Sequence, residues 1–174
     1  MSIVVAYLIA AITIQLVHNV ILDGAHSREL SSIVLLMILG MTDSAIVSII
    51  VISGLVVLII SSIDEETTSL FLLGITGLII ITGTNSLIII YLGLELIGLT
   101  FYILAARERK GVKSTEAGIK YFILGALSSG ILLLGMSLAY ATTGTTSLEL
   151  VTGASATMIK IGLLFKVGAT PFHM

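Results

Sequence analysis

The chain has 174 residues, of which 57% are hydrophobic and 10% charged, and its formal net charge is -2. A soluble domain carries about 25% charged residues, so this composition excludes folding in water. It indicates a protein that crosses a lipid bilayer several times. The weak negative charge argues against nucleic acid as a partner. The chain has no cysteine, which excludes disulfides, iron–sulfur clusters and zinc–thiolate sites within it.

Six segments are apolar and long enough for membrane-spanning helices, each of which needs about 20 such residues. They cover residues 3–22, 44–63, 67–83, 86–106, 117–141 and a last segment that begins near residue 154. Polar stretches such as "DGAHSRE" and "RERKGVK" separate them. The pattern predicts an all-α membrane protein with about six transmembrane helices.

One apolar piece, "LSSIVLLMILGM" at residues 30–41, is too short for a span, and Asp43 separates it from the next segment. An interfacial helix, a re-entrant piece and a pair of strands all fit this stretch. The sequence leaves the fold of residues 30–42 open.

The only basic loop orients the spans. Residues 107–113 hold four basic side chains, and loops rich in lysine and arginine stay on the cytoplasmic or matrix side. Counting spans outward from this loop predicts that the N-terminus and residues 64–66 lie on the same inner side. Asp43 and Glu149 are then expected on the outer side.

Glu95 is the clearest ionisable residue inside a span, because it lies halfway along residues 86–106. A charged side chain at the bilayer centre costs about 2.5–3.5 kcal/mol, and glutamate is too short to reach the interface. The position favours a proton or ion site. A glutamate that only hydrogen-bonds a neighbouring helix is the structural alternative.

Two lysines are further candidates. Lys166 lies about twelve residues into the last span, where it either titrates or pairs with a neighbouring backbone carbonyl. Lys120 lies near the inner end of its span, so it either exchanges protons or extends its ammonium to the interface.

Pro171 is the only proline of the chain, and it follows Lys166 in the last span. Proline removes a helical hydrogen bond and clashes with the preceding turn. At membrane depth the released carbonyl must be satisfied by water or polar groups. We therefore expect a last helix interrupted near Pro171, with Lys166 and His173 on either side of the break. A kink without function is the alternative.

Glu95, Lys120, Lys166 and His173 together form a set of proton-exchanging groups in an apolar medium. At an effective dielectric of ~20, a glutamate and a lysine about 7 Å apart couple by about 2.4 kcal/mol. Moving the carboxylate toward a lysine would load a proton onto it, and moving it away would release one. A proton pump needs such a switch, whereas a static scaffold does not.

The residues around these groups also carry a family likeness. The stretches "LGLELIGLTFYILAA", "STEAGIKYFILGALSSGILLLGMSLAYATTGT" and "GLLFKVGATPFHM" closely resemble subunit 2 of proton-pumping NADH–ubiquinone oxidoreductase, respiratory complex I. The likeness covers residues 87–174, and the last stretch is shared with related antiporter-like subunits and cation/proton antiporters.

The resemblance implies the roles of the site residues and the chemistry of the whole assembly. Glu95, Lys120, Lys166 and His173 would transfer protons in a half-channel, next to the helix break at Pro171. The chain would be a subunit of an enzyme that couples NADH oxidation and ubiquinone reduction to proton translocation, with no redox chemistry of its own. NADH, FMN, iron–sulfur clusters and ubiquinone would bind other subunits, and this chain would hold no cofactor or metal.

The resemblance also implies a domain organisation, partners and a location. Residues 1–63 would be N-terminal transmembrane helices, and residues 64–174 the start of the antiporter-like repeat, incomplete at its C-terminus. We expect a second polypeptide with the other half of the subunit, further membrane-arm subunits and lipids such as cardiolipin as partners. Heavy use of isoleucine and the absence of tryptophan favour an organelle gene, hence the mitochondrial inner membrane with the N-terminus in the matrix. A structural subunit without proton transfer and a cation/proton antiporter subunit remain alternatives, and a bacterial or chloroplast membrane remains the alternative location.

Overall fold

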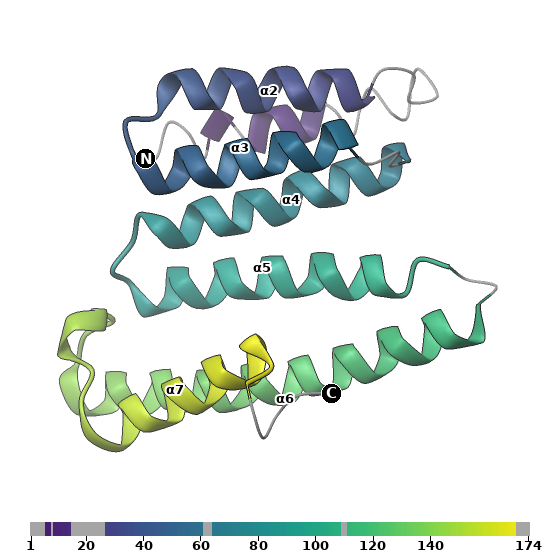
Figure 1. Cartoon of the computed structure of the whole chain (residues 1–174). Helices are drawn as coiled ribbons and strands as arrows, with labels where there is room; N and C mark the ends of the chain where they lie inside the picture. Colours follow the sequence, from purple (N-terminus) through teal and green to yellow (C-terminus); the bar gives the residue numbers. More distant parts are fainter. Residues whose placement is uncertain (1–5, 8, 15–26, 61–63, 109–110, 170–174) are drawn as a thin grey trace. The chain divides into compact units, whose positions relative to one another are not determined.

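The computed structural model describes residues 6–7, 9–14, 27–60, 64–108 and 111–169. In this part the chain is helical nearly throughout, without a named strand, and one isolated bridge joins Ser86 and Ser147 (Figure 1). The helices are α2 (Ser27–Met41), α3 (Ala45–Ile60), α4 (Glu65–Thr82), α5 (Leu87–Ala105), α6 (Val112–Thr143) and α7 (Gly153–Val167). Residues 6–7 and 9–14 are also helical, and Leu148–Leu150 forms a 3-10 turn. The all-α prediction is confirmed.

The stretch that the sequence left open is a helix, which excludes a pair of strands. Residues 30–41 belong to α2, and Ser31, Leu35 and Ile38 on it are at most 2% exposed. These positions recur every three to four residues, so they line one face of a helix. α2 is thus one more helical element than the six predicted spans provide.

Contacts between residues divide the chain into two compact units, Met1–Gly83 and Thr84–Met174. In the first unit α2, α3 and α4 pack on one another around an aliphatic core (Figure 1). The core consists of Ile12, Leu35, Ile38, Val47, Val51, Leu58, Leu72, Ile75 and Ile79. Gly54 of α3 leaves room for the end of the Ile75 side chain of α4, since a Cβ at Gly54 would lie 2.6 Å from the Cδ1 atom of Ile75.

The unit boundary after Gly83 lies further along the chain than the domain boundary expected after residue 63. The two boundaries describe different things, since the units reflect packing and the expected boundary marks the start of a functional repeat. The division into 1–63 and 64–174 therefore stays a prediction.

In the second unit α6 packs against both α5 and α7 (Figure 1). The buried apolar residues are Leu87, Leu132, Met136, Ala139 and Ile159. Helix α6 begins at Val112, earlier than the predicted start at residue 117, so the basic loop is shorter than expected.

Tyr102 of α5 fits the α5–α6 contact through a glycine of α6. A Cβ at Gly125 would lie 1.8 Å from the hydroxyl oxygen of Tyr102, and the tyrosine ring meets Tyr121 edge-on at 4.8 Å. Gly125 therefore provides the space that this aromatic side chain occupies.

Hydrogen bonds tie the second unit at both ends. The backbone N–H of Leu87 donates to the carbonyl of Thr146 at 2.8 Å, and that of Leu148 donates to Asn85 at 2.8 Å. These bonds fasten the α6–α7 loop to the start of α5. At the opposite end of α5 the Ser114 hydroxyl donates to the Ala105 carbonyl at 2.9 Å. Both ends of α5 are thus held against the adjoining segments.

Helix α7 ends at Val167, before Pro171 is reached, and the cause is a glycine. Gly168 adopts the left-handed conformation with φ 68°, which glycine tolerates best. The N–H of Ala169 then donates to the Leu164 carbonyl at 3.0 Å, which satisfies a terminal acceptor of the helix. Pro171 and His173 lie outside the described residues, so the interruption predicted near Pro171 is not described there.

The exterior of the helices is apolar. Within the described residues, Leu87–Ala105 and Val112–Thr143 are long and apolar enough to cross a membrane, whereas α2, α3 and α4 are shorter apolar helices. Large aliphatic side chains are widely exposed, such as Ile59 at 75% and Ile60 at 79%. Such a surface suits contact with acyl chains or other membrane helices.

Candidate functional site

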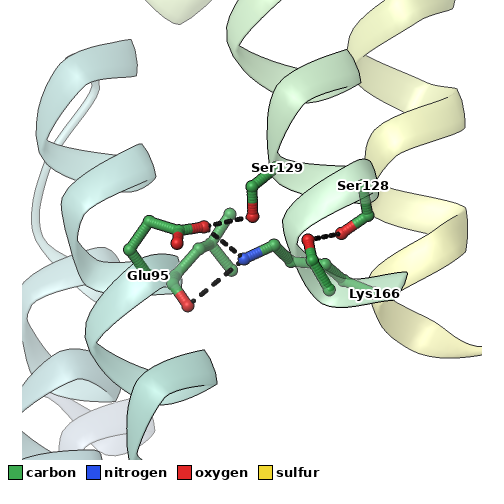
Figure 2. A network of polar contacts seen from close by, with 6 residues as sticks. Glu95, Ser128, Ser129 and Lys166 are labelled. Atoms are coloured by element: carbon green, nitrogen blue, oxygen red, sulfur yellow. Dashed lines mark hydrogen bonds and ion pairs between the residues drawn. The ribbon is translucent and has the colours of Figure 1, made fainter. Parts of the chain in front are cut away.

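The candidate site lies in the second unit and begins with Glu95, at the middle of α5. The helix around it, "LIIIYLGLELIGLTFYILA", has no proline and no other charge. The Glu95 side chain is 26% exposed and points toward α6 and α7 (Figure 2). An ionised carboxylate in such apolar surroundings needs partners to remain charged.

Lys166 is the ionic partner of Glu95. Its Nζ atom lies 2.8 Å from the Glu95 Oε1 atom, and its side chain is 13% exposed. The same ammonium donates to the carbonyl of Leu94 at 3.4 Å. Lys166 therefore contacts a backbone carbonyl, as the structural interpretation expects, and also pairs with Glu95. Whether it titrates stays a prediction.

Ser129 of α6 contributes a third group that the sequence analysis missed. Its hydroxyl donates to Oε1 of Glu95, the oxygen that also accepts from Lys166 (Figure 2). The neighbouring Ser128 donates instead to the carbonyl of Gly125, at 2.8 Å. Ser129 lies on the buried face of α6 with Ser128 and Leu132, but a serine in an apolar segment does not stand out in the sequence.

Lys120 does not join this cluster. It pairs with Glu116 one turn earlier on α6, and the two side chains are 59% and 57% exposed. Its position is about two turns into α6 rather than at its start. Its role on a proton route stays a prediction, and His173 lies outside the described residues.

The three groups at Glu95 can exchange protons. A carboxylate accepts a proton, an ammonium gives one, and a hydroxyl does either. Among the described residues no group of three or more histidine, cysteine, aspartate or glutamate side chains is placed to hold a metal ion.

A family profile described as "NADH:quinone oxidoreductase/Mrp antiporter, TM" matches residues 84–174, the same residues as the second unit. Curated relatives are similar as well. The chain is 43% identical over 127 residues to NADH-quinone oxidoreductase subunit N of Gemmatimonas aurantiaca, covering 66% of this chain and 24% of that protein. It is 46% identical over 121 residues to the Jannaschia sp. protein of the same name, covering 63% of this chain and 25% of that protein.

A solved structure, described as respiratory complex I from Thermus thermophilus with bound aureothin, contains a chain of the same fold. Its TM-score is 0.85 at 22% identity, covering 98% of this chain and 45% of that chain. The chain thus matches about a quarter of the length of the two curated relatives. The family profile spans half of the sequence and includes both Glu95 and Lys166. The protein therefore belongs to the NADH:quinone oxidoreductase/Mrp antiporter transmembrane family.

Proposed function

We propose that the chain is a membrane-arm subunit of a proton-translocating NADH:quinone oxidoreductase, and that α5, α6 and α7 contribute a proton half-channel to it. The observation that carries the proposal is the ion pair of Glu95 and Lys166 on two apolar helices. The relatives named NADH-quinone oxidoreductase subunit N support the choice of assembly. NADH, FMN, iron–sulfur clusters and ubiquinone would bind other subunits.

The ion pair can work as a switch whose setting depends on distance. At 2.8 Å and an effective dielectric of ~20, the two charges attract by about 6 kcal/mol. Separation to about 7 Å would lower this attraction by about 3.5 kcal/mol. A movement of Lys166 by a few ångströms, driven by redox energy, would therefore change how strongly the pair holds together.

The end of α7 supports such a movement. Lys166 lies in the last turn of the helix, two residues before the left-handed Gly168. Fewer helical hydrogen bonds hold the last turn than the middle of a helix. A small displacement of this terminus would separate Nζ from Oε1 and leave α5 and α6 in place.

Substitution of the pair tests the function in the intact assembly. Lys166→Ala and Glu95→Gln should each assemble but abolish proton pumping and lower coupled NADH oxidation, measured as dye quenching in sealed vesicles and as NADH consumption. A subunit that only braces the assembly would retain both activities in these variants. Sodium-dependent transport without NADH oxidation would instead indicate a cation/proton antiporter.

We also propose that the chain lies in the mitochondrial inner membrane. The matched relatives come from bacteria, whose plasma membrane suits the same chemistry. Further membrane-arm subunits and cardiolipin are the expected partners. Immunoprecipitation of the assembly followed by mass spectrometry would identify the polypeptides and the bound lipids.

A further inference from the structure

One oxygen of Glu95 accepts hydrogen bonds from two different helices. Oε1 receives the ammonium of Lys166 from α7 at 2.8 Å and the hydroxyl of Ser129 from α6. Neither donor reaches Oε2, which accepts no hydrogen bond from any described residue. The two carboxylate oxygens are therefore in different environments. Oε1 accepts two hydrogen bonds, and Oε2 is open to a proton.

The two donors differ in how firmly they are held. Ser129 is 5% exposed, its side chain has a single rotatable bond to the hydroxyl oxygen, and it lies in the middle of α6. Lys166 reaches Oε1 through a four-carbon stem from the last turn of α7. Displacement of α7 would therefore remove the ammonium from Oε1 and leave the hydroxyl there.

We propose that Ser129 is the positioning residue of the proton-transfer pair, holding Oε1 of Glu95 in place while Lys166 leaves and returns. This inference rests on the function proposed above. With Oε1 fixed by the hydroxyl, the carboxylate keeps its orientation when the ammonium has moved. The incoming proton is then received at Oε2 and handed on from there.

The charge of Glu95 also supports a positioning role for Ser129, in addition to the geometry. A hydrogen bond to a carboxylate is stronger than one between neutral groups. Without Ser129, Glu95 would lose every protein donor among the described residues each time Lys166 moves away. A bare carboxylate in apolar surroundings either turns to another partner or stays protonated, and both outcomes interrupt proton transfer.

Ser128 supplies a matched control on the same turn of α6. It is as buried as Ser129, at 1% exposure, but its hydroxyl donates to the Gly125 carbonyl of its own helix and does not reach Glu95 (Figure 2). Replacement of either serine by alanine removes the same atom from the same helix. Only replacement of Ser129 removes a donor from the carboxylate.

The experiment compares Ser129→Ala, Ser129→Thr and Ser128→Ala in the intact assembly. Because a bond to a charged group is lost, Ser129→Ala should lower the rate of proton pumping about tenfold. Ser129→Thr keeps the hydroxyl and should restore most of the rate, whereas Ser128→Ala should pump like the wild type. Equal losses in Ser129→Ala and Ser129→Thr, or equal losses in both alanine variants, would attribute the defect to packing and overturn the proposal.

An infrared measurement reports the hydrogen bond itself. The carboxyl band of Glu95, assigned by its absence in Glu95→Gln, should shift in Ser129→Ala and remain unchanged in Ser128→Ala. If Ser129→Ala does not assemble, Ser129→Cys tests the same point, since a thiol has nearly the shape of the hydroxyl but is a weak donor. Wild-type pumping in Ser129→Cys, or an unshifted band in Ser129→Ala or Ser129→Cys, contradicts the inference.

The same series separates this inference from the function on which it rests. Normal pumping in Ser129→Ala together with lost pumping in Glu95→Gln would remove Ser129 from the mechanism and leave the half-channel standing. Normal pumping in both Glu95→Gln and Lys166→Ala would remove the half-channel, and the positioning role would fall with it.

Discussion

Glu95 shows how a carboxylate can be kept inside an apolar helix. An ammonium and a hydroxyl from two other helices converge on its Oε1 atom, and these bonds offset part of the cost of removing the charge from water. Each donor comes from a different part of the sequence, so the charge is tolerated only when three helices have packed. Glu95 thereby links the chemistry of the site to the fold of the second unit.

Replacing Lys166 alone should lower the stability of the fold more than replacing Glu95 and Lys166 together. Lys166→Met leaves the Glu95 charge without its ionic partner, and an unsatisfied buried group costs about 1–3 kcal/mol. The double variant Glu95→Gln and Lys166→Met contains no charge to satisfy and should regain most of this stability. The measurement is the melting temperature of this chain within the solubilised assembly. A double variant less stable than Lys166→Met would show that Glu95 stabilises the fold even without Lys166, and would contradict this argument.

At the residue scale, the sequence predicts which ionisable residues lie inside the membrane-spanning segments, where a charge costs free energy, but not which groups they contact. Glu95 and Lys166 stand out because charge is rare in apolar segments. Their contact joins residues 71 positions apart, and sequence spacing within a helix carries no information on such a distance. Ser129 remained hidden because a serine inside a membrane helix usually satisfies its own backbone, as Ser128 does.

At the scale of elements, glycines set the approach of α6 to α7. A Cβ at Gly135 would lie 2.8 Å from the backbone nitrogen of Ile159, and one at Gly162 would lie 2.9 Å from the Cβ atom of Leu132. Small residues of this kind let helix backbones approach in a membrane, where the hydrophobic effect does not drive helices together. These contacts determine where α7, the helix that carries Lys166, lies along the length of α6.

Alanine at these glycines should therefore separate the two helices. Gly135→Ala and Gly162→Ala should each destabilise the chain by about 1–3 kcal/mol, as overpacking does, and weaken pumping by moving Lys166. Gly130→Ala is the control, because a Cβ there meets nothing within 4 Å. Since alanine favours a helix by about 1 kcal/mol over glycine, this control should be neutral or stabilising. Thermal melting of the assembly distinguishes the variants, and equal effects at all three glycines would refute the packing argument.

The ends of the helices are harder to predict from the sequence than the presence of the helices. Apolar length gave the approximate extent of α3, α4, α5 and α6, because a bilayer demands it. The last helix is expected to be interrupted near Pro171, and α7 ends at Gly168, three residues before that proline. A glycine followed by a proline is a known signal for a helix C-terminus, so this end was readable from "KVGATP". The start of α6 was missed because polar residues also form the ends of membrane helices.

At the scale of the whole molecule, the second compact unit and the family profile cover the same residues, 84–174. The half of the chain with recognisable motifs is therefore also the half that folds around Glu95. The hydrophobic core of the first unit is mainly aliphatic, and cores of this kind tolerate many sequences that conserve volume and pattern. This explains why the sequence offered no distinctive motif before residue 84.

The helical nature of α2 also changes the count of membrane crossings. α2 and α3 have 15 and 16 residues and run alongside one another in opposite directions (Figure 1). If both cross the bilayer, the start of α2 lies on the inner side and Asp43 on the outer side, and the N-terminus moves from the matrix side to the outer side. An interfacial α2 would leave both ends of the helix outside, as the sequence-based count assumed.

Single cysteines decide between these arrangements, since the chain has none of its own. Glu29, Asp43, Lys113 and Glu149 are exposed and suit replacement by cysteine. Lys113→Cys and Glu149→Cys calibrate the two sides, because the basic loop is expected inside. We expect a membrane-impermeant thiol reagent, applied from outside, to label Asp43→Cys but not Glu29→Cys, because α2 packs on α3 and α4 and shares their apolar core. Labelling of both positions from the outside would place α2 on the membrane surface and return the N-terminus to the inner side.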